Sequence, residues 1–142
     1  MAKDFKNAHE NMLFRQFLPN KLTDERLLHA FEEVWREKFI PAPSNALSYC
    51  DQNVVLPVKG REALSSLSLM RLLQAAKLSK KHRVLNIASG TGFGAVVLSY
   101  LAKSVVCLEE NDSLYGILLD NIQQFSSAHI KPVKGPLVEG VP

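Results

Sequence analysis

Apolar residues in the first half of the chain recur at the spacing expected of amphipathic helices. This spacing predicts a helix over residues 4–17 and a second helix with Thr23 as its N-cap, which Pro41 and Pro43 end. A third helix is predicted over residues 67–76, and a loop with short extended pieces precedes it. The apolar stripes expected to face the core are Leu27, Leu28, Phe31, Val34 and Trp35 in the second helix, and Leu69, Leu72, Leu73 and Ala76 in the third.

The pattern changes after residue 82, where short apolar runs begin to alternate with helical segments. The order is strand 83–88, helix 92–101, strand 104–110, helix 112–125 and strand 129–135. The first run is rich in leucine and β-branched residues, which predicts a buried strand. Asp112 or Ser113 is expected near the cap of the last helix, and Pro132 in the last strand suits either a sheet edge or the end of a strand. Strands that alternate with helices predict a parallel sheet with right-handed crossovers.

Composition narrows the possible functions. The 142 residues, 46% of them hydrophobic, suit one domain with a substantial core, and the net charge of +3 is too weak and too scattered to indicate a nucleic-acid partner. No apolar run approaches the ~18 residues of a membrane span, and the N-terminus lacks the apolar core of a signal peptide. Of two cysteines, Cys107 is expected to be a buried thiol, and a reduced, cytoplasmic protein is predicted.

The four histidines do not have the spacing of metal ligands, so no metal site is predicted. They are His9, His29, His82 and His129.

The segment with the most chemical information is "RVLNIASGTGFGAVVLSYLAKSVVCLEEN" (residues 83–111). A strand that opens into a helix through glycines lets a ligand approach the backbone closely, and ligands of parallel sheets lie beyond the carboxyl ends of the strands. Glu109 ends the second strand, 17 residues after Gly92. A carboxylate in that position can accept two hydrogen bonds from a ribose diol. The loop and Glu109 together predict a nucleoside site.

Two classes of ligand remain open on these residues alone. Gly90, Gly92 and Ala95 fit the dinucleotide fingerprint, which predicts a pyrophosphate at the helix end. Such motifs commonly open their domain, whereas roughly 80 residues precede this one. The other class is S-adenosylmethionine, whose enzymes use the same strand, loop and helix and the same acid on the ribose.

Several segments in order resemble the protein-L-isoaspartate O-methyltransferase family, specifically a divergent bacterial branch of it. These are "DERLLHAFEEVWREKFIP" near the N-terminus, "LPVKG" before the third helix, the glycine segment quoted above and "VKGPLVEGVP" at the end. The resemblance extends over nearly the whole chain. It implies the Rossmann-like α/β three-layer sandwich of S-adenosylmethionine-dependent methyltransferases, with helices added at the N-terminus.

The resemblance also implies an activity and a set of site residues. The expected reaction moves a methyl group from S-adenosylmethionine to the carboxylate of an isoaspartyl residue in a damaged protein or peptide, which is a protein repair reaction. One continuous domain is expected, with a helical and substrate-loop region at 1–78 and the first half of the methyltransferase domain at 79–142. The expected cofactor-binding residues are Asn86, Ala88, Ser89, Gly90, Thr91, Gly92 and Glu109.

The chain departs from the family at several of these positions. The family usually has an acid where Asn86 stands, a glycine where Ala88 stands, and an adenine-binding aspartate where Pro136 stands. Each lost hydrogen bond could weaken cofactor binding by ~1 kcal/mol or more.

The substrate loop departs further, because the catalytic serine of the family has no certain counterpart in "GREALSSLSLM". An alignment without gaps places Leu64 there, and a slip of one residue places Ser65 there. Ser65 is therefore a candidate catalytic residue, and the alternative is that it only caps the following helix. Arg61 is expected either to contact a substrate carboxylate or to lie solvated on the loop.

Only three strands are visible, fewer than the resemblance implies, so the chain looks truncated after the third strand. A half-sheet would expose apolar surface along an open edge. We therefore expect these residues alone to be poorly active or inactive. A non-catalytic relative that binds a nucleoside or a partner protein, and an NAD-linked oxidoreductase, remain as alternatives.

Overall fold

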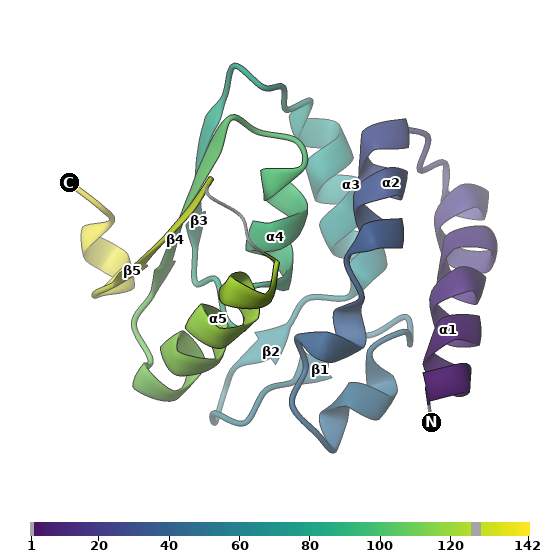
Figure 1. Ribbon diagram of the computed structural model, residues 1–142, viewed down its shortest axis with the longest axis horizontal. Coiled ribbons are helices and arrows are strands. Elements are labelled where there is room, and N and C mark those ends of the chain that lie inside the picture. Colours follow the sequence, from purple (N-terminus) through teal and green to yellow (C-terminus); the bar gives the residue numbers. More distant parts are fainter. Residues whose placement is uncertain (1, 126–128) are drawn as a thin grey trace.

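The computed structural model describes residues 2–125 and 129–142 (Figure 1). The helices are α1 (Ala2–Asn11), α2 (Glu25–Glu33), α3 (Ser66–Ala76), α4 (Phe93–Ser99) and α5 (Asp112–Gln124). The strands are β1 (Val54–Val55), β2 (Glu62–Ala63), β3 (Arg83–Ile87), β4 (Ser104–Glu109) and β5 (Ile130–Lys134). A π-helical segment, Met12–Phe17, extends α1, and short 3-10 turns lie at Leu18–Asn20, Arg36–Lys38, Ser44–Leu47 and Leu137–Glu139.

Strands β3, β4 and β5 form one parallel sheet in that order, which confirms the prediction for the second half of the chain. The register pairs Asn86 with Cys107 and Glu109 with Lys134. Pro132 lies in β5, at the edge of the sheet, which is one of the two positions predicted for it. Strands β1 and β2 pair separately as an antiparallel hairpin, which the sequence had indicated only as short extended pieces.

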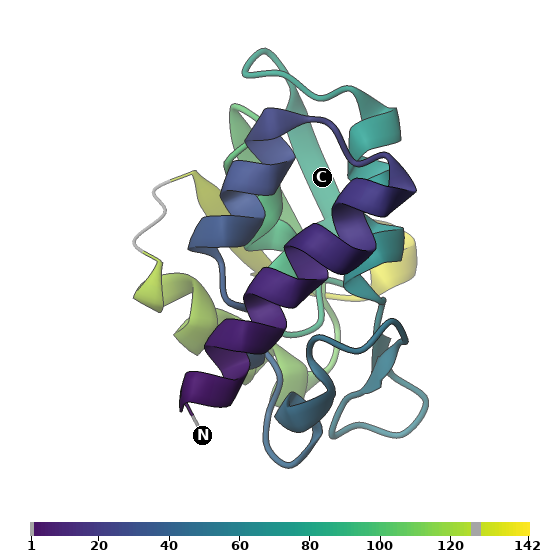
Figure 2. The same ribbon diagram turned by 90° about the vertical axis from the view of Figure 1, so that its right-hand side faces the viewer.

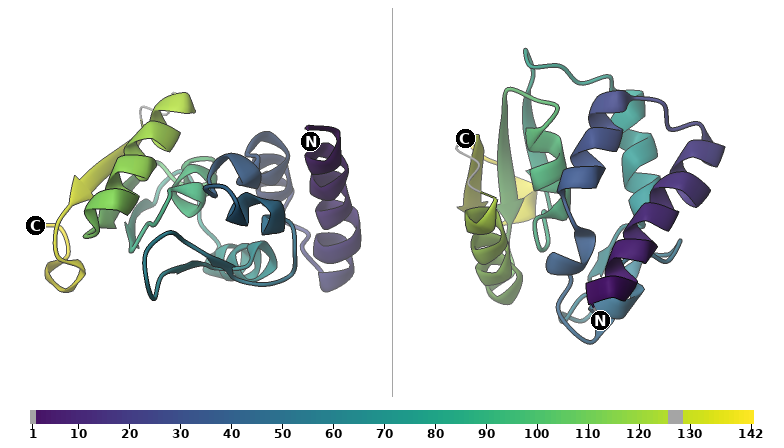
Figure 3. Two further views of the ribbon diagram at one scale, coloured as in Figure 1. Left: turned by 90° about the horizontal axis from the view of Figure 1, so that it is seen from below. Right: turned by 45° about the vertical axis from the view of Figure 1, so that its right-hand side comes forward.

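Helices α4 and α5 pack against the sheet from one side, because both crossovers are right-handed and run in the same direction (Figure 1). The N-terminal helices add to this side, with α2 against α3 and α4, and α1 runs obliquely across them (Figure 2). The two views of Figure 3 show the helices gathered on one side of the sheet. The core therefore lies between the sheet and these helices, and it includes apolar residues from both halves of the chain.

The opposite face of β3 is open to solvent, so the prediction of a buried strand is wrong. Leu85 is 43% exposed and Ile87 is 51% exposed, whereas the neighbouring β4 residues Cys107 and Leu108 are fully buried. The two strands have similar apolar sequences, but β3 lies at an edge and no described element covers its outer face. The buried Cys107 thiol was predicted correctly, and burial raises its pKa to about 11.

The N-terminal helices differ from the predictions at their ends. Asp24, not Thr23, caps α2, since its carboxylate accepts a hydrogen bond from Arg26 N while Thr23 N donates to Gln74 Oε1. The helix ends at Glu33, well before the prolines that were expected to end it. Asn111 caps α5, and Asp112 and Ser113 follow it directly, near the cap as predicted.

Helix α3 packs on the core along a stripe that overlaps the predicted one only in part. Its buried apolar residues are Leu67 and Met70, whereas Leu72 is 61% exposed. Of the predicted stripe, Leu69 and Leu73 are partly buried and pack against the core, while Ala76 is exposed. Within the described residues, no helix has both the length and the apolar character needed to cross a bilayer.

Candidate functional site

The loop between β3 and α4 has the backbone conformation that its glycines permit. Gly90 has a φ of 60° and Gly92 a φ of 98°, both in the left-handed region that glycine adopts without steric cost. A Cβ on Gly92 would lie 2.8 Å from Leu118 Cδ1 in α5. Ser89 N donates to Leu108 O, and Gly92 N donates to Ser89 O, so the loop is fixed against the end of β4.

Ala88 also has a left-handed backbone, with a φ of 58°. The sequence analysis placed this alanine where the family usually has glycine. A left-handed conformation costs an L-residue about 1–2 kcal/mol. The loop therefore takes this turn at an energetic cost.

Glu109 is fully buried at the carboxyl end of β4, and its carboxylate faces the glycine loop. Its Oε1 accepts a hydrogen bond from Gly90 N at 2.9 Å, and its Oε2 accepts one from Asn111 N at 2.9 Å. The strand ends there because the next residues turn into α5. Two backbone donors from different loops therefore fix the direction of this carboxylate.

Arg61, in the β1–β2 hairpin, completes the surroundings of Glu109. Its Nη2 lies 2.6 Å from Glu109 Oε1 and its Nη1 lies 3.0 Å from Glu109 Oε2. The sequence had suggested a substrate contact or a solvated arginine, and no local pattern pointed to this pair because the two residues are 48 positions apart.

The surroundings of Glu109 keep its carboxyl group ionised. Burial alone raises the pKa of Glu109, but the hydrogen bonds from Arg61, Asn111 and Gly90 outweigh it, so the pKa lies below its usual value of 4.5. The same pair raises the pKa of Arg61 above its usual value, since the hydrogen bond to Glu109 favours the charged guanidinium. The site therefore contains a buried anion with a complete set of donors.

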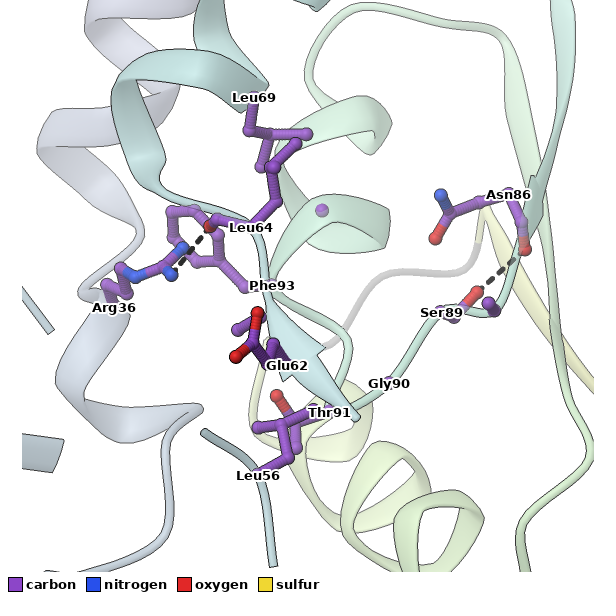
Figure 4. A pocket seen from close by; sticks show the side chains of 13 residues that line it. Arg36, Leu56, Glu62, Leu64, Leu69, Asn86, Ser89, Gly90, Thr91 and Phe93 are labelled. Atoms are coloured by element: carbon purple, nitrogen blue, oxygen red, sulfur yellow. Dashed lines mark hydrogen bonds between the residues drawn. The ribbon is translucent and has the colours of Figure 1, made fainter. Parts of the chain in front are cut away.

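A cavity of about 240 Å³ lies between the glycine loop and the β1–β2 hairpin (Figure 4). It is smaller than the ~300–1,000 Å³ of typical ligand pockets. Leu56, at the end of the hairpin, approaches the loop so closely that a Cβ on Gly90 would lie 3.5 Å from its Cδ1. The residues around the cavity are Arg36, Leu56, Glu62, Ala63, Leu64, Leu69, Asn86, Ala88, Ser89, Gly90, Thr91, Phe93 and Gly94.

The cavity brings together most of the residues that the sequence had put forward for cofactor binding, with Glu109 just behind Gly90. The buried Oδ1 of Asn86 has no hydrogen-bond partner among the described residues. Ser89 Oγ donates to Asn86 O at 2.7 Å, and Asn121 Nδ2 donates to Thr91 O at 2.8 Å. These bonds fix the loop and leave the Asn86 amide directed toward the cavity (Figure 4).

Arg36, which the sequence analysis did not consider, lies on the opposite side of the cavity. It is 1% exposed, its Nη2 donates to Leu64 O at 2.7 Å, and its guanidinium carbon lies 5.1 Å from the centre of the Phe93 ring. Its buried Nε has no partner among the described residues. Burial lowers the pKa of Arg36 to about 10, so the group is still charged near neutral pH.

Ser65, the candidate catalytic residue, caps α3. Its Oγ accepts a hydrogen bond from Ser68 N at 3.3 Å and donates to Ser68 Oγ at 2.9 Å. Ser65 is buried. Leu64, which the alignment without gaps places at the position of the catalytic serine, is 39% exposed and lines the cavity. The capping role is thus observed, and Ser65 is not among the residues that line the cavity.

The C-terminal segment passes close to Glu109 through its backbone. Gly135 N donates to Glu109 O at 3.2 Å, and Leu137 N donates to the Glu110 carboxylate. Pro136 lies between them and is exposed. Proline has no N–H, so this position offers a ligand neither a carboxylate nor a backbone donor.

Comparison with known proteins identifies the family. A sequence profile of the protein-L-isoaspartate(D-aspartate) O-methyltransferase family matches residues 8–141. The chain belongs to this family. It is 30% identical over 139 residues to protein-L-isoaspartate O-methyltransferase 2 of Marinobacter nauticus, which covers 96% of this chain and 63% of that protein. A relative from Opitutus terrae with the same enzyme name is 33% identical over 104 residues, or 72% of this chain and 44% of that protein.

Solved structures confirm the fold. A protein-L-isoaspartate O-methyltransferase superposes with a TM-score of 0.82 at 24% identity and covers 94% of this chain and 44% of its own. A Plasmodium falciparum structure described with the same enzyme name, in complex with S-adenosyl-L-homocysteine, gives a TM-score of 0.71 at 18% identity over 88% of this chain and 62% of its own. The chain therefore has the Rossmann-like α/β methyltransferase fold, and it spans 44–63% of the length of these family members.

Proposed function

We propose that this chain binds S-adenosylmethionine and belongs to a carboxyl methyltransferase that acts on isoaspartyl residues of damaged proteins. Glu109 carries the proposal, because a buried, ionised carboxylate directed at a glycine loop has the chemistry to bind a ribose diol. Membership of the family favours this ligand over the dinucleotide that the glycine spacing also allowed.

The residues around the cavity fit the proposed cofactor. Asn86 Oδ1 is a buried acceptor without a partner among the residues that the structure describes, and an ammonium or amine donor of a ligand could satisfy it. Gly90 lines the cavity without a side chain, Gly92 lets the loop pack closely on Leu118 of α5, and Thr91 is fixed by Asn121. We assign ligand binding to Asn86, Ala88, Ser89, Gly90, Thr91, Gly92 and Glu109, as the sequence predicted.

When bound, S-adenosylmethionine supplies a methyl group on a positively charged sulfur. The proposed acceptor is a carboxylate that is already ionised at pH 7, so the chain needs no general base for the reaction. Its residues would act by holding the two reactants in line and by excluding water. Ser65 remains the candidate for contact with the substrate, and for that its hydroxyl would have to leave Ser68.

Isothermal titration calorimetry with S-adenosylhomocysteine and with NAD tests the ligand. We expect the first to bind and the second not to bind. Glu109→Gln should weaken binding about tenfold or more, because it removes the negative charge that accepts the ribose hydroxyls. Glu110→Gln changes an exposed neighbour and is the matched control. Binding of NAD alone would refute the proposed ligand.

A second candidate is a relative that binds the ligand without catalysis, and two observations favour it. Leu64 lines the cavity where the gap-free alignment places the catalytic serine, and Ser65 is bonded to its own helix. A methyl-transfer assay on an isoaspartyl peptide distinguishes the two. Ligand binding without turnover in the complete protein supports the non-catalytic relative. Turnover supports the methyltransferase, with Ser65 as its catalytic residue if Ser65→Ala abolishes turnover without weakening S-adenosylhomocysteine binding.

We further propose that the protein acts in the cytoplasm, on damaged proteins or peptides. Both cysteines of the chain are free thiols, as expected in a reducing compartment.

A further inference from the structure

The carboxylate of Glu109 has no acceptor position left for a ligand in this structure. A carboxylate has about four acceptor sites, two on each oxygen. Gly90 N and Arg61 Nη2 bond to Oε1, while Asn111 N and Arg61 Nη1 bond to Oε2. The two backbone donors are part of the loop framework, so only the two positions that Arg61 uses can be given to a ligand.

Arg61 presents its two donors in the arrangement that a ribose would use. One guanidinium nitrogen bonds to each carboxylate oxygen, at 2.6 and 3.0 Å. A vicinal diol that binds a carboxylate also brings one donor to each oxygen. The guanidinium and the diol are therefore alternative partners for the same pair of sites.

The hairpin holds the backbone of Arg61, while part of its side chain lies at the surface. Arg61 O accepts a hydrogen bond from Leu56 N, and Arg61 N donates to Val58 O. The Arg61 side chain is nevertheless 23% exposed, while Glu109 is completely buried. The guanidinium can turn toward solvent without opening the hairpin, whereas Glu109 cannot leave its place.

We propose that Arg61 is a specificity-determining residue that competes with the ribose diol of the ligand for Glu109. This inference rests on the proposed nucleoside site. Without ligand, Arg61 neutralises the buried carboxylate. A nucleoside binds only by replacing both guanidinium hydrogen bonds. Its binding free energy is therefore reduced by the free energy of the interaction between Arg61 and Glu109 that it replaces. Ligands that lack the diol cannot make this exchange.

Calorimetry on variants of the full 142-residue chain tests the exchange. Arg61→Met removes both donors at similar side-chain length, and we expect S-adenosylhomocysteine and adenosine to bind about tenfold or more tightly than to the unmodified chain. Arg61→Lys keeps the charge but not the paired donors and should give a smaller gain. The affinity for 2′,3′-dideoxyadenosine should not change in either variant. Arg71→Gln, an exposed arginine of α3, is the matched control.

The outcomes separate this inference from the proposed function. Equal or weaker binding of adenosine by folded Arg61→Met, with clear binding by the unmodified chain, overturns the competition and leaves the nucleoside site standing. Failure of every folded variant to bind any nucleoside overturns both. Circular dichroism establishes folding, and if Arg61→Met does not fold, Arg61→Lys decides, since equal affinity for adenosine in that variant contradicts the exchange.

Discussion

Two buried charges lie near the same cavity and differ in almost every other respect. Glu109 and Arg36 are 0% and 1% exposed. Glu109 has a donor for each of its four acceptor sites, including a partner of opposite charge. Arg36 has one carbonyl and one aromatic ring as partners, and no carboxylate pairs with it among the described residues.

The difference shows that burial alone does not determine what a charge costs. The hydrogen-bond donors around Glu109 outweigh the effect of burial and lower its pKa, so the fold favours its charged form. Burial lowers the pKa of Arg36 to about 10, so the fold disfavours its charged form. The surroundings of Glu109 stabilise its charge, whereas those of Arg36 only partly compensate for the burial of its charge.

The largest effect should come from Glu109→Ala. This change leaves Arg61 without its partner and two buried N–H groups, of Gly90 and Asn111, without an acceptor. We expect a loss of about 3–5 kcal/mol in the free energy of unfolding, measured by urea denaturation. Glu110→Ala, at the exposed neighbour, should cost less than about 1 kcal/mol. Similar losses at the two positions would contradict the importance of the Glu109 network.

Acid should reproduce part of this loss, because protonation removes the charge of Glu109 but leaves the side chain in place. A carboxyl group with a folded-state pKa below its unfolded value contributes stability above the unfolded value and loses it as the pH falls through the folded value. Stability should therefore decrease as the pH drops below the usual value of 4.5. Urea midpoints across this range should fall more steeply for the unmodified chain than for Glu109→Gln, and parallel curves would argue against the network.

Arg36→Met should have a smaller effect, despite equal burial. The lost bond to Leu64 O can cost about 1–3 kcal/mol. The lowered pKa of Arg36 corresponds to about 3 kcal/mol of penalty for the charge, which methionine removes. The two changes oppose each other, so the free energy of unfolding should change by about 1 kcal/mol or less. A loss as large as that of Glu109→Ala, in the same urea experiment, would mean that Arg36 has a partner of comparable strength.

The smallest change in stability is expected from Ala88→Gly, on the loop between the two charges. Glycine at this left-handed position relieves about 1–2 kcal/mol of strain but adds about 0.4–1 kcal/mol of entropy to the unfolded chain. Ala88→Gly should therefore raise the melting temperature slightly, corresponding to about 1 kcal/mol or less. Ala75→Gly, at an exposed position inside α3, should lower it, because the backbone there is helical.

The sequence was a good guide to features determined by neighbouring residues. The alternation of apolar runs and helical spacing predicted β3, α4, β4, α5 and β5 in their parallel order. The end of β4 placed Glu109 at the same sheet edge as the glycine loop, and the structure connects them through Gly90 N. The N-cap of α2 was predicted one residue too early, since Thr23 and Asp24 are both good caps and it is the Asp24 carboxylate that accepts from Arg26 N.

Features that depend on distant residues could not be predicted in the same way. Arg61 and Glu109 are 48 positions apart, and Arg36 and Leu64 are 28 apart. Nothing in the sequence near an arginine indicates which distant oxygen it will meet. The exposure of Leu85 and Ile87 likewise depends on which elements cover β3, not on the residues of the strand.

The position of β3 has a consequence for hydrogen exchange. In a parallel pair, each strand directs alternate backbone N–H groups to its neighbour, so an edge strand has amides that point away from the sheet. Strand β4 has neighbours on both sides, whereas β3 has one. In deuterated water the amides of β4 should therefore exchange slowest, and those of β3 that face outward should exchange early, so that protection falls from the centre of the sheet toward the strand that leads into the glycine loop.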